Sequence, residues 1–346
     1  MTARTTRRRP LLAAAGTGLA LLLAACGGSA EDAAPGTAPD ASPDASVGAS
    51  AEPSAGPSGG ASDGTGASDD TADGDFPVTV TSGQEPDTTE LTIETEPVSI
   101  VSISPSGTEM LYAIGAGDQV VAVDDFSYFP AEAPVTDLSG FEPNVEAILG
   151  YAPDLVVASG DPGDLVSSLD AAGVPTLLLP SALDLDEAYD QIERVGAATG
   201  HLEEAEALTQ KMAADIEAAV ASVPTGEPLT YYHELDPSFF SASSDTFIGQ
   251  VYGLFGLENI ADATGEAYPQ LSQEFIVEAD PDVIFVTSGD FSDSPETISA
   301  RPGWDGITAV ADGDVVVVDA DTSSRWGPRV VDFVEAVAAE LPQVRE

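Results

Sequence analysis

The longest amphipathic pattern in the chain runs from His201 to Val223. Apolar residues recur there at steps of three and four, at Leu202, Ala205, Leu208, Met212, Ile216, Ala219 and Val220. This spacing predicts one helix with a single apolar face. Gly200 ends the preceding helical pattern and Pro224 follows the segment, so both ends carry stop signals. At ~1.5 Å per residue the helix should be roughly 34 Å long, about the width of a small domain.

Two similar segments flank this helix. One begins at Glu146 and the other at Glu274, and both read E-x-I-x4-P-D, then an apolar run, then Gly-Asp. The two glutamates are 128 positions apart, and the midpoint, residue 210, falls inside the predicted helix. A helix-Pro-Asp-strand unit can occur twice by chance in an α/β protein, but five matched positions in register favour a true repeat. The helix is therefore predicted to be a spine that joins two similar lobes.

Short apolar runs alternate with helical patterns on both sides of the spine. An alternating pair, 76–81 and 90–95, predicts an opening hairpin. Strands are then predicted at 98–104, 119–123, 154–158, 175–179, 229–233, 283–287 and 315–318, and helices at 108–114, 144–150, 164–172, 185–198, 246–255, 273–278 and 328–341. This alternation predicts an α/β fold with parallel sheets in two three-layer lobes, 76–200 and 224–346, around the spine 201–223. Ligands of such sheets bind beyond the carboxyl ends of the strands, so we expect a cleft between the lobes.

The first 25 residues have the pattern of a signal peptide. Four arginines precede an apolar core from Leu11 to Ala25 that is too short to remain as a membrane span. The core ends in Leu23-Ala24-Ala25-Cys26, which resembles the lipobox of bacterial lipoproteins. Cys26 is the single cysteine, so it cannot form an internal disulfide. The alternative is an ordinary secreted protein with a stray cysteine. We expect a chain that begins at lipidated Cys26 and is anchored on the extracytoplasmic face of the cell membrane.

Residues 26–75 are almost free of large apolar side chains. They are rich in Ala, Gly, Ser, Pro, Thr and Asp, a composition that predicts a disordered linker. The stretch 56–60 matches G-x-S-x-G, but no strand precedes it and no helix follows, so it does not indicate a hydrolase.

The charge balance is strongly acidic. The chain has ten Lys and Arg against sixty Asp and Glu, and four of the ten lie in the predicted signal peptide. A nucleic-acid partner is not expected, because phosphate contacts require clustered cations. The acidic excess is typical of a solubilising surface or a saline habitat.

Aromatic residues gather in stretches without helical or strand periodicity. Phe126, Tyr128 and Phe129 lie in one loop, and Phe141 and Tyr268 each precede one of the repeat units. Such residues can belong to the core, but a large flat ligand needs surfaces of this kind. We therefore predict that these five side chains contact a ligand.

Polar candidates lie at strand ends and around one late loop. Ser104, Ser106 and Thr108 either cap the first helix, the expected role of Thr108, or line the cleft. Arg325 precedes a helix predicted to begin at Pro328 and is expected to face the cleft, where it can hold a carboxylate, an amide oxygen or a phosphate. Asp321 can accept hydrogen bonds there. Trp326 can stack on a ligand or pack internally, and Arg329 can pair with local acids.

The two histidines limit metal chemistry. His201 is expected at the surface, and His233, which ends a predicted strand, can ligate a metal centre of the ligand or be a hydrogen-bonded structural residue. A bare zinc or manganese site with several imidazoles is hard to build from two histidines. We expect neither a resident metal nor a cofactor.

Several motifs occur together in a way that resembles one protein family. They are I-V-S-I-S-P-S-G-T-E at 100–109, F-S-Y-F-P at 126–130, the two E-x-I-x4-P-D units, Y-P-Q-L-S at 268–272, G-W at 303–304 and S-R-W-G-P-R at 324–329. Over about residues 76–342 the chain resembles the helical-backbone substrate-binding proteins of ABC importers, which include cobalamin, haem and iron-siderophore receptors. The S-P-x-x-T-E run and the Y-P-Q-L-S segment, similar to W-P-Q-V-S, are closest to the cobalamin-binding member.

The resemblance implies a receptor that delivers a metal chelate, with a corrinoid favoured, to an ABC permease dimer. It also implies that Glu146 and Glu274 contact permease arginines, although a helix start by itself favours an acidic residue. Two departures leave cobalamin, other corrinoids, haem and ferric siderophores open as ligands. Residues 97–99 replace a basic pair, and Phe141 or Tyr268 replaces a tryptophan.

Two other classes of function are alternatives to a receptor. An extracellular α/β enzyme would need a nucleophile, a base and an acid in one arrangement, and none is visible. A two-lobed adhesin or scaffold would need neither cleft aromatics nor a buried arginine.

Overall fold

A computed structural model describes residues 76–288 and 294–344. These residues lie in one compact unit, Ala67–Glu346. The predicted signal peptide, the lipidation site Cys26 and the linker 26–75 lie outside the described residues. None of the described helices is both long and apolar enough to cross a membrane.

The described chain opens with the predicted hairpin. Strands β1 (Val78–Gln84) and β2 (Asp87–Ile93) pair antiparallel, with Val78 opposite Ile93. The hairpin lies against β6 (Thr176–Leu178), because the Ser82 hydroxyl donates to the Thr176 carbonyl at 3.3 Å and accepts from the Leu178 N–H at 2.9 Å. Polar side-chain contacts therefore attach the hairpin to the N-terminal lobe.

The N-terminal lobe is a three-layer α/β structure. Its four parallel strands have the order β4–β3–β5–β6, where β3 is Ile100–Ile103, β4 is Val120–Val123 and β5 is Leu155–Ala158. Alternate residues of these strands enter two separate apolar clusters, so both faces of the sheet are covered. One cluster also holds α1 (Pro105–Ala113) and α4 (Leu185–Thr199), and the other holds α2 (Val145–Leu149) and α3 (Leu165–Ala171).

The C-terminal lobe repeats this plan. Its strands β7 (Thr230–Glu234), β8 (Glu258–Asn259), β9 (Val283–Ser288) and β10 (Val315–Asp319) are parallel and have the order β8–β7–β9–β10. Helices α6 (Phe247–Gly253) and α11 (Val330–Val344) share an apolar cluster with one face of the sheet. Helices α7 (Gln273–Ala279), α8 (Pro295–Ser299) and α9 (Thr308–Asp312) share a cluster with the other face.

The two E-x-I-x4-P-D units occupy equivalent places in the two sheets. Ile148 and Ile276 are both fully buried under their strands. The Asp154 carboxylate accepts from the Val98 N–H at 3.1 Å, and the Asp282 carboxylate accepts from the Thr230 N–H at 2.7 Å. Each aspartate thus ties the start of its strand to the start of the neighbouring central strand. The repeat read in the sequence is a structural repeat.

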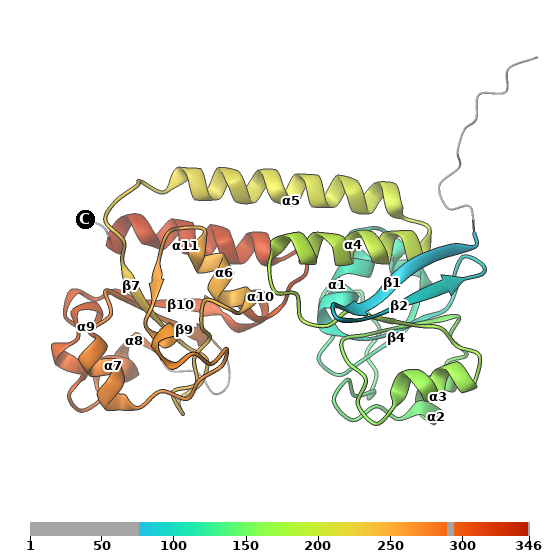
Figure 1. The fold of residues 1–346 in the computed structure, drawn as a ribbon, viewed down its shortest axis with the longest axis horizontal. Helices are drawn as coiled ribbons and strands as arrows, with labels where there is room; N and C mark the ends of the chain where they lie inside the picture. The colour runs from blue at the N-terminus through green and yellow to red at the C-terminus, as the bar shows by residue number, and fades with distance from the viewer. Residues whose placement is uncertain (1–75, 289–293, 345–346) are drawn as a thin grey trace, which may run out of the picture. The chain divides into compact units, whose positions relative to one another are not determined.

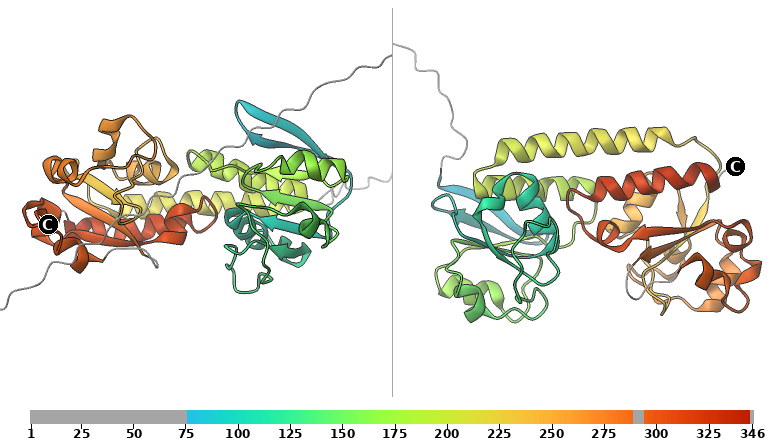
Figure 2. Two further views of the ribbon diagram at one scale, coloured as in Figure 1. Left: turned by 90° about the horizontal axis from the view of Figure 1, so that it is seen from below. Right: turned by 180° about the vertical axis from the view of Figure 1, so that it is seen from behind.

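Helix α5 (Leu202–Ser222) is the spine and connects the two lobes. It packs along α4 of the N-terminal lobe and α11 of the C-terminal lobe (Figures 1 and 2). Its buried Ala205, Met212 and Ile216 belong to one apolar cluster that also contains strands and helices of both lobes. Leu202 departs from the predicted stripe and is exposed, because it lies in the first turn. The predicted fold of two α/β lobes on a single spine helix is confirmed.

Several short elements were not predicted. They are β8, α8, α9, α10 (Ala320–Ser324) and the 3-10 turns η1 (Ala116–Gln119), η2 (Ile260–Thr264) and η3 (Trp304–Gly306). Each helical element is shorter than two turns and β8 has only two residues. Such short elements cannot show a repeating pattern of apolar residues, so the sequence does not predict them. Helix α11 begins at Val330, two residues later than predicted.

Candidate functional site

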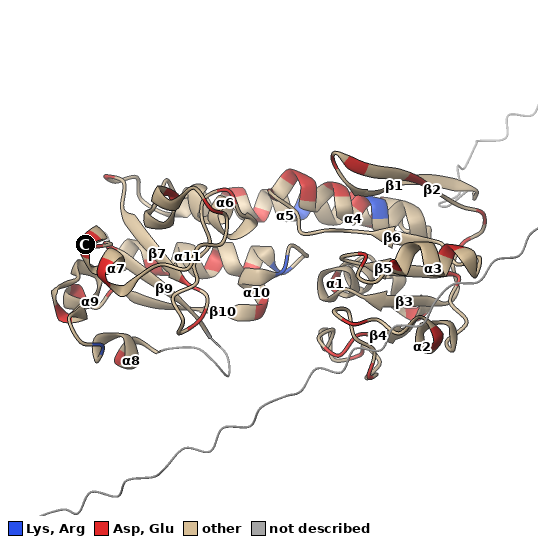
Figure 3. Ribbon diagram, turned by 60° about the horizontal axis from the view of Figure 1, so that its bottom comes forward, with Lys and Arg blue, Asp and Glu red and all other residues tan. Residues whose placement is uncertain are grey.

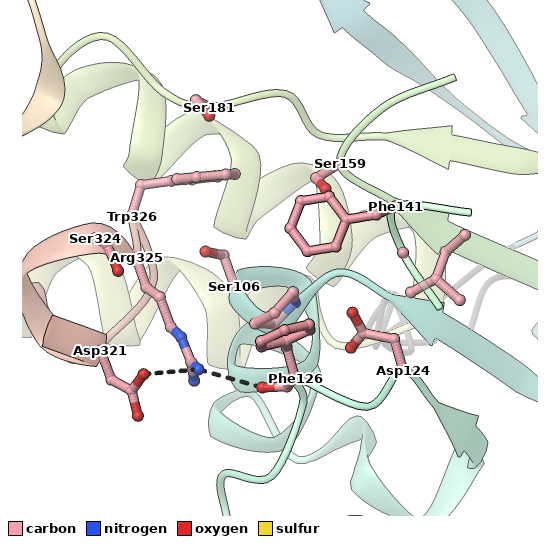
Figure 4. Close-up of a pocket in the computed structure, with 13 residues that line it drawn as sticks. Ser106, Asp124, Phe126, Phe141, Ser159, Ser181, Asp321, Ser324, Arg325 and Trp326 are labelled. Atoms are coloured by element: carbon pink, nitrogen blue, oxygen red, sulfur yellow. Dashed lines mark hydrogen bonds and ion pairs between the residues drawn. The ribbon is translucent and has the colours of Figure 1, made fainter. Parts of the chain in front are cut away.

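A pocket of about 370 Å³ lies between the two lobes (Figure 4). Its N-terminal side is built from residues at the carboxyl ends of β3, β4 and β5 and from Ser181 after β6. Its C-terminal side is the segment 321–326, which follows β10. The complete lining is Ile103, Pro105, Ser106, Asp124, Phe126, Gly140, Phe141, Ser159, Ser181, Asp321, Ser324, Arg325 and Trp326. The position agrees with the rule that open parallel sheets bind ligands beyond their strand ends.

Three aromatic residues make the pocket wall apolar. Phe126 and Phe141 meet edge to face, with ring centroids 5.6 Å apart, yet they are 48% and 74% exposed. The Trp326 indole N–H donates to the Gln191 side-chain oxygen of α4 at 2.9 Å, which fixes the ring across the lobe boundary. Exposed aromatic rings held in a fixed place form a surface suited to a large flat ligand.

Arg325 is buried at the back of the pocket. Its guanidinium donates to Glu109 Oε1 at 2.8 Å, to the Phe126 carbonyl at 3.2 Å and to Asp321 Oδ1 at 3.0 Å. It also lies over the Tyr128 ring, 5.0 Å from the centroid. The prediction that Arg325 faces the cleft agrees with this placement. Arg325 also forms an ion pair with Glu109 of the other lobe, and the sequence does not indicate this pairing.

Glu109 joins two arginines of the other lobe. Its side chain is 1% exposed, and it accepts from Arg325 and, through both oxygens, from Arg329 at 3.0 and 2.6 Å. The Glu109 carboxylate raises the pKa of Arg329. The expectation that Arg329 pairs with local acids is wrong, because its partner lies on α1 of the other lobe. We call Glu109, Arg325, Arg329, Asp321 and Tyr128 the interlobe network.

Tyr128 adds a second link between the lobes. Its hydroxyl donates to the Asp321 carboxylate at 2.7 Å, and its ring is 57% exposed. The pKa of Tyr128 is raised, mainly because the hydroxyl is buried and secondly because of this hydrogen bond. Phe129 does not line the pocket: it stacks under Arg329, 4.1 Å from the guanidinium carbon, beside a smaller apolar cavity. Of the three loop aromatics, only Phe126 is in the lining.

The three hydroxyl residues of α1 have separate roles. Ser104 is buried and caps the helix by accepting from the Gly107 N–H at 3.1 Å. Ser106 lines the pocket. Thr108, which was expected to be the cap, is fully buried, and its hydroxyl lies 2.8 Å from Ser102 Oγ and 2.9 Å from Ser127 Oγ. The expected capping role therefore belongs to Ser104.

Besides Ser104, Tyr128 and Phe129, two further predicted ligand contacts lie outside the lining. His233 is fully buried in the C-terminal lobe, its Nδ1 is 2.9 Å from the Tyr252 hydroxyl, and burial lowers its pKa to about 3. Of the two alternatives for His233, a ligand of a metal centre or a hydrogen-bonded structural residue, the structure agrees with the second. Tyr268 is 53% exposed and is not among the lining residues.

Seven lining residues are not among the predicted ligand contacts: Ile103, Pro105, Asp124, Gly140, Ser159, Ser181 and Ser324. Four of them, Asp124, Gly140, Ser159 and Ser181, lie on the N-terminal lobe after its strands. Asp124 and Ser159 come directly after β4 and β5, so the strand-end rule, applied to every predicted strand, would have found them. Burial raises the pKa of Asp124, and a hydrogen bond from Ser127 opposes this shift. Gly140 and Ser181 carry no comparable signal.

Glu146 and Glu274 lie far from one another in sequence but occupy the same position in their helices. Each is the second residue of its helix, α2 or α7, and each is exposed. Asn144 and Ser272 cap these helices with their side chains. Neither glutamate lines the pocket.

The charge pattern of the described part is dominated by acids on both lobes (Figure 3). Each Lys and Arg that the structure describes pairs with a carboxylate, in the pairs Arg194–Asp190, Lys211–Asp215, Arg301–Glu234, Arg325–Glu109 and Arg329–Glu109. Within residues 76–288 and 294–344, no group of three or more His, Cys, Asp or Glu side chains could hold a metal ion.

The chain belongs to the periplasmic binding protein family, whose model matches residues 100–322. It is 33% identical to the uncharacterised ABC transporter substrate-binding lipoprotein YvrC of Bacillus subtilis, over 77% of this chain and 86% of that protein. It is 34% identical to a cobalamin-binding protein of Halobacterium salinarum, over 76% of this chain and 73% of that protein. The periplasmic vitamin B12 binding protein BtuF of Vibrio cholerae has a similar structure, with a TM-score of 0.63, 26% identity, and coverage of 72% of this chain and 98% of that chain. The resemblance read from the motifs is thus confirmed, and the protein belongs to a class of solute-binding proteins, not enzymes.

Proposed function

We propose that this protein is an extracytoplasmic lipoprotein receptor that binds a metal chelate, with a corrinoid favoured, and delivers it to an ABC permease. The observation that carries the proposal is the pocket between the lobes. It combines exposed, fixed aromatic rings with hydroxyls and a buried arginine. The similarity to a cobalamin-binding protein and to BtuF supports a corrinoid as the ligand.

The size of the pocket fits partial enclosure of the ligand. Pockets for small molecules commonly occupy about 300–1,000 Å³, and this one holds about 370 Å³. A macrocyclic chelate is larger, so part of it would remain exposed at the rim formed by Phe141. In this proposal the rings of Phe126, Phe141 and Trp326 contact the flat face of the chelate. Ser106 and the remaining N–H groups of Arg325 hydrogen-bond to its periphery.

The proposed docking surfaces are the exposed starts of α2 and α7. Glu146 and Glu274 lie at equivalent positions of the two repeats, one on each lobe. A permease dimer offers two equivalent surfaces, and complementary charge across such an interface sets its register and association rate. We propose that these glutamates meet basic residues of the permease. Anchoring through Cys26 would hold the receptor near it.

A ferric siderophore or haem is the alternative ligand class. The family resemblance includes such receptors, and the aromatic surface suits them as well. Purification of the protein from its host, with an absorption spectrum and a metal analysis, distinguishes the classes. The result expected is cobalt in a stoichiometric amount and a corrinoid spectrum. Iron with a haem or hydroxamate spectrum would establish the alternative.

A further inference from the structure

We propose that the pocket selects chelates that carry no net negative charge and that offer N–H donors, and that Asp124 determines this selection. The inference rests on the proposed function, because it concerns the ligand of the same pocket. Its basis is the position of one carboxylate and the pairing of every nearby cation.

Asp124 is held rigidly at the end of β4. It is 3% exposed, and its backbone N–H donates to the Ser102 carbonyl at 3.0 Å. The Ser127 hydroxyl donates to Asp124 Oδ1, and Ser127 Oγ lies 2.9 Å from Thr108 Oγ1 on α1. Because this chain of hydrogen bonds reaches into a helix, the carboxylate is fixed before a ligand arrives.

The other oxygen of Asp124 faces the pocket. Oδ2 accepts no hydrogen bond from any residue that the structure describes, although the side chain is buried. A Cβ at Gly140, which also lines the pocket, would lie 2.9 Å from this oxygen. Glycine therefore leaves Oδ2 uncovered. In Figure 4 the Asp124 carboxylate points toward the side of Phe126 and Ser106.

Because Oδ2 is open to the pocket, a ligand that covers it must supply a hydrogen-bond donor, or the carboxylate oxygen is left without a partner in the complex. A primary amide of the ligand supplies such an N–H. A carboxylate of the ligand would instead face Asp124 with the same charge, and like charges brought together at an interface weaken binding.

The pocket has no unpaired cation among its described residues to offset this repulsion. Arg325 is the single cation of the lining, and its charge is balanced by Glu109 and Asp321. Asp321 itself lines the pocket opposite Asp124 (Figure 4). An anionic ligand would therefore meet two carboxylates and one neutralised guanidinium.

The ligand class that satisfies these conditions is a neutral or cationic chelate with amide groups at its edge. A corrinoid with primary amide side chains meets both conditions. Haem, with two carboxylates, meets neither condition, and ferric tricatecholates, with three negative charges, fail the condition on charge.

The test uses the Cys26→Ser chain and isothermal titration with three probes. The probes are cyanocobalamin, its monocarboxylic acids in which one peripheral amide is hydrolysed, and haem. We expect cyanocobalamin to bind at least about tenfold more tightly than the most weakly bound monoacid and than haem. Asp124→Asn keeps the size of the side chain and removes the charge. In this variant the affinity for cyanocobalamin should exceed that for the most weakly bound monoacid by about threefold or less. Asp125→Asn, at an exposed neighbour, should leave the ratio unchanged.

The outcomes separate the inference from the proposed function. An unchanged ratio in Asp124→Asn, with the melting temperature showing that the variant is folded, overturns the inference while the receptor function stands. Tighter binding of haem than of cyanocobalamin by the wild type overturns the charge selection and the preference for a corrinoid together. Binding of none of the three probes, and of no ferric hydroxamate, overturns both proposals.

Discussion

Replacement of Glu109 should destabilise the protein more than replacement of either arginine that pairs with it. Glu109 is 1% exposed and receives hydrogen bonds from Arg325, 8% exposed, and Arg329, 18% exposed. Glu109→Gln removes the charge that both guanidiniums share, so two cations remain at the lobe boundary. Removal of one partner from a buried pair costs about 3–5 kcal/mol.

The arginine variants provide the comparison. In Arg325→Ala the Glu109 carboxylate keeps both hydrogen bonds from Arg329, and in Arg329→Ala it keeps the bond from Arg325. Each of these variants should therefore lose only about 1.5–3 kcal/mol, the value of a hydrogen bond to a charged group. Lys211→Ala, which removes an exposed pair with Asp215, should change the stability by less than about 1 kcal/mol and is the control.

Urea unfolding followed by circular dichroism measures these differences. For a domain of this size, a loss of 3–5 kcal/mol corresponds to a decrease in melting temperature of roughly 6–20 °C. A Glu109→Gln variant within about 1 kcal/mol of the wild type, or less affected than Arg325→Ala, would refute the idea that Glu109 is the shared partner of the interlobe network.

Four further predictions concern ligand binding, motion, pH and docking. Arg325→Ala should weaken chelate binding about ten- to 150-fold, because a charge-assisted hydrogen bond is worth ~1.5–3 kcal/mol; titration calorimetry measures this, and unchanged affinity removes Arg325 from the site. Small-angle scattering curves with and without ligand should nearly superimpose, since one continuous helix and a shared apolar cluster resist hinge motion; a large compaction would contradict this. Burial raises the pKa of Asp124 above its usual 3.8, so the ionised form lowers stability once the pH rises through the folded-state pKa. Asp124→Asn should therefore have a higher free energy of unfolding than the wild type at pH 7, and this difference should vanish below about pH 3.8. A difference that grows as the pH falls would contradict this expectation. Glu146→Arg with Glu274→Arg should leave ligand affinity intact and reduce uptake by cells, and wild-type uptake at low receptor levels would exclude docking through these residues.

The fold was predictable because its main elements are long enough to show their periodicity. The spine helix repeats its apolar positions over five turns, and the two Pro-Asp units mark the same strand start in each lobe. The lack of periodicity around Phe126 indicated one residue that lines the pocket. Ser106, Phe141, Asp321, Arg325 and Trp326 also line the pocket.

The remainder of the site depends on tertiary contacts that leave no local pattern. Glu109 lies in the middle of α1, and its partner Arg325 is 216 positions later, so neither sequence neighbourhood indicates the pair. Tyr128 and Phe129 are adjacent in one loop, but one bonds Asp321 and the other stacks under Arg329. His233 ends the strand that the sequence predicts, as a pocket residue would, but in the structure β7 continues to Glu234 and Tyr252 of α6 packs against the buried His233 ring.

Tryptophan fluorescence tests the central claim most directly. The chain has two tryptophans: Trp326 lines the pocket, and Trp304 is fully buried in the C-terminal lobe. Titration of the Cys26→Ser chain with cyanocobalamin should quench the emission saturably at one equivalent, because in the proposed site the corrin chromophore lies near Trp326. Trp326→Phe should abolish most of the saturable quenching, while Trp304→Phe should retain it. No saturable quenching by cyanocobalamin, haem or a ferric hydroxamate would contradict the assignment of this pocket as a chelate site.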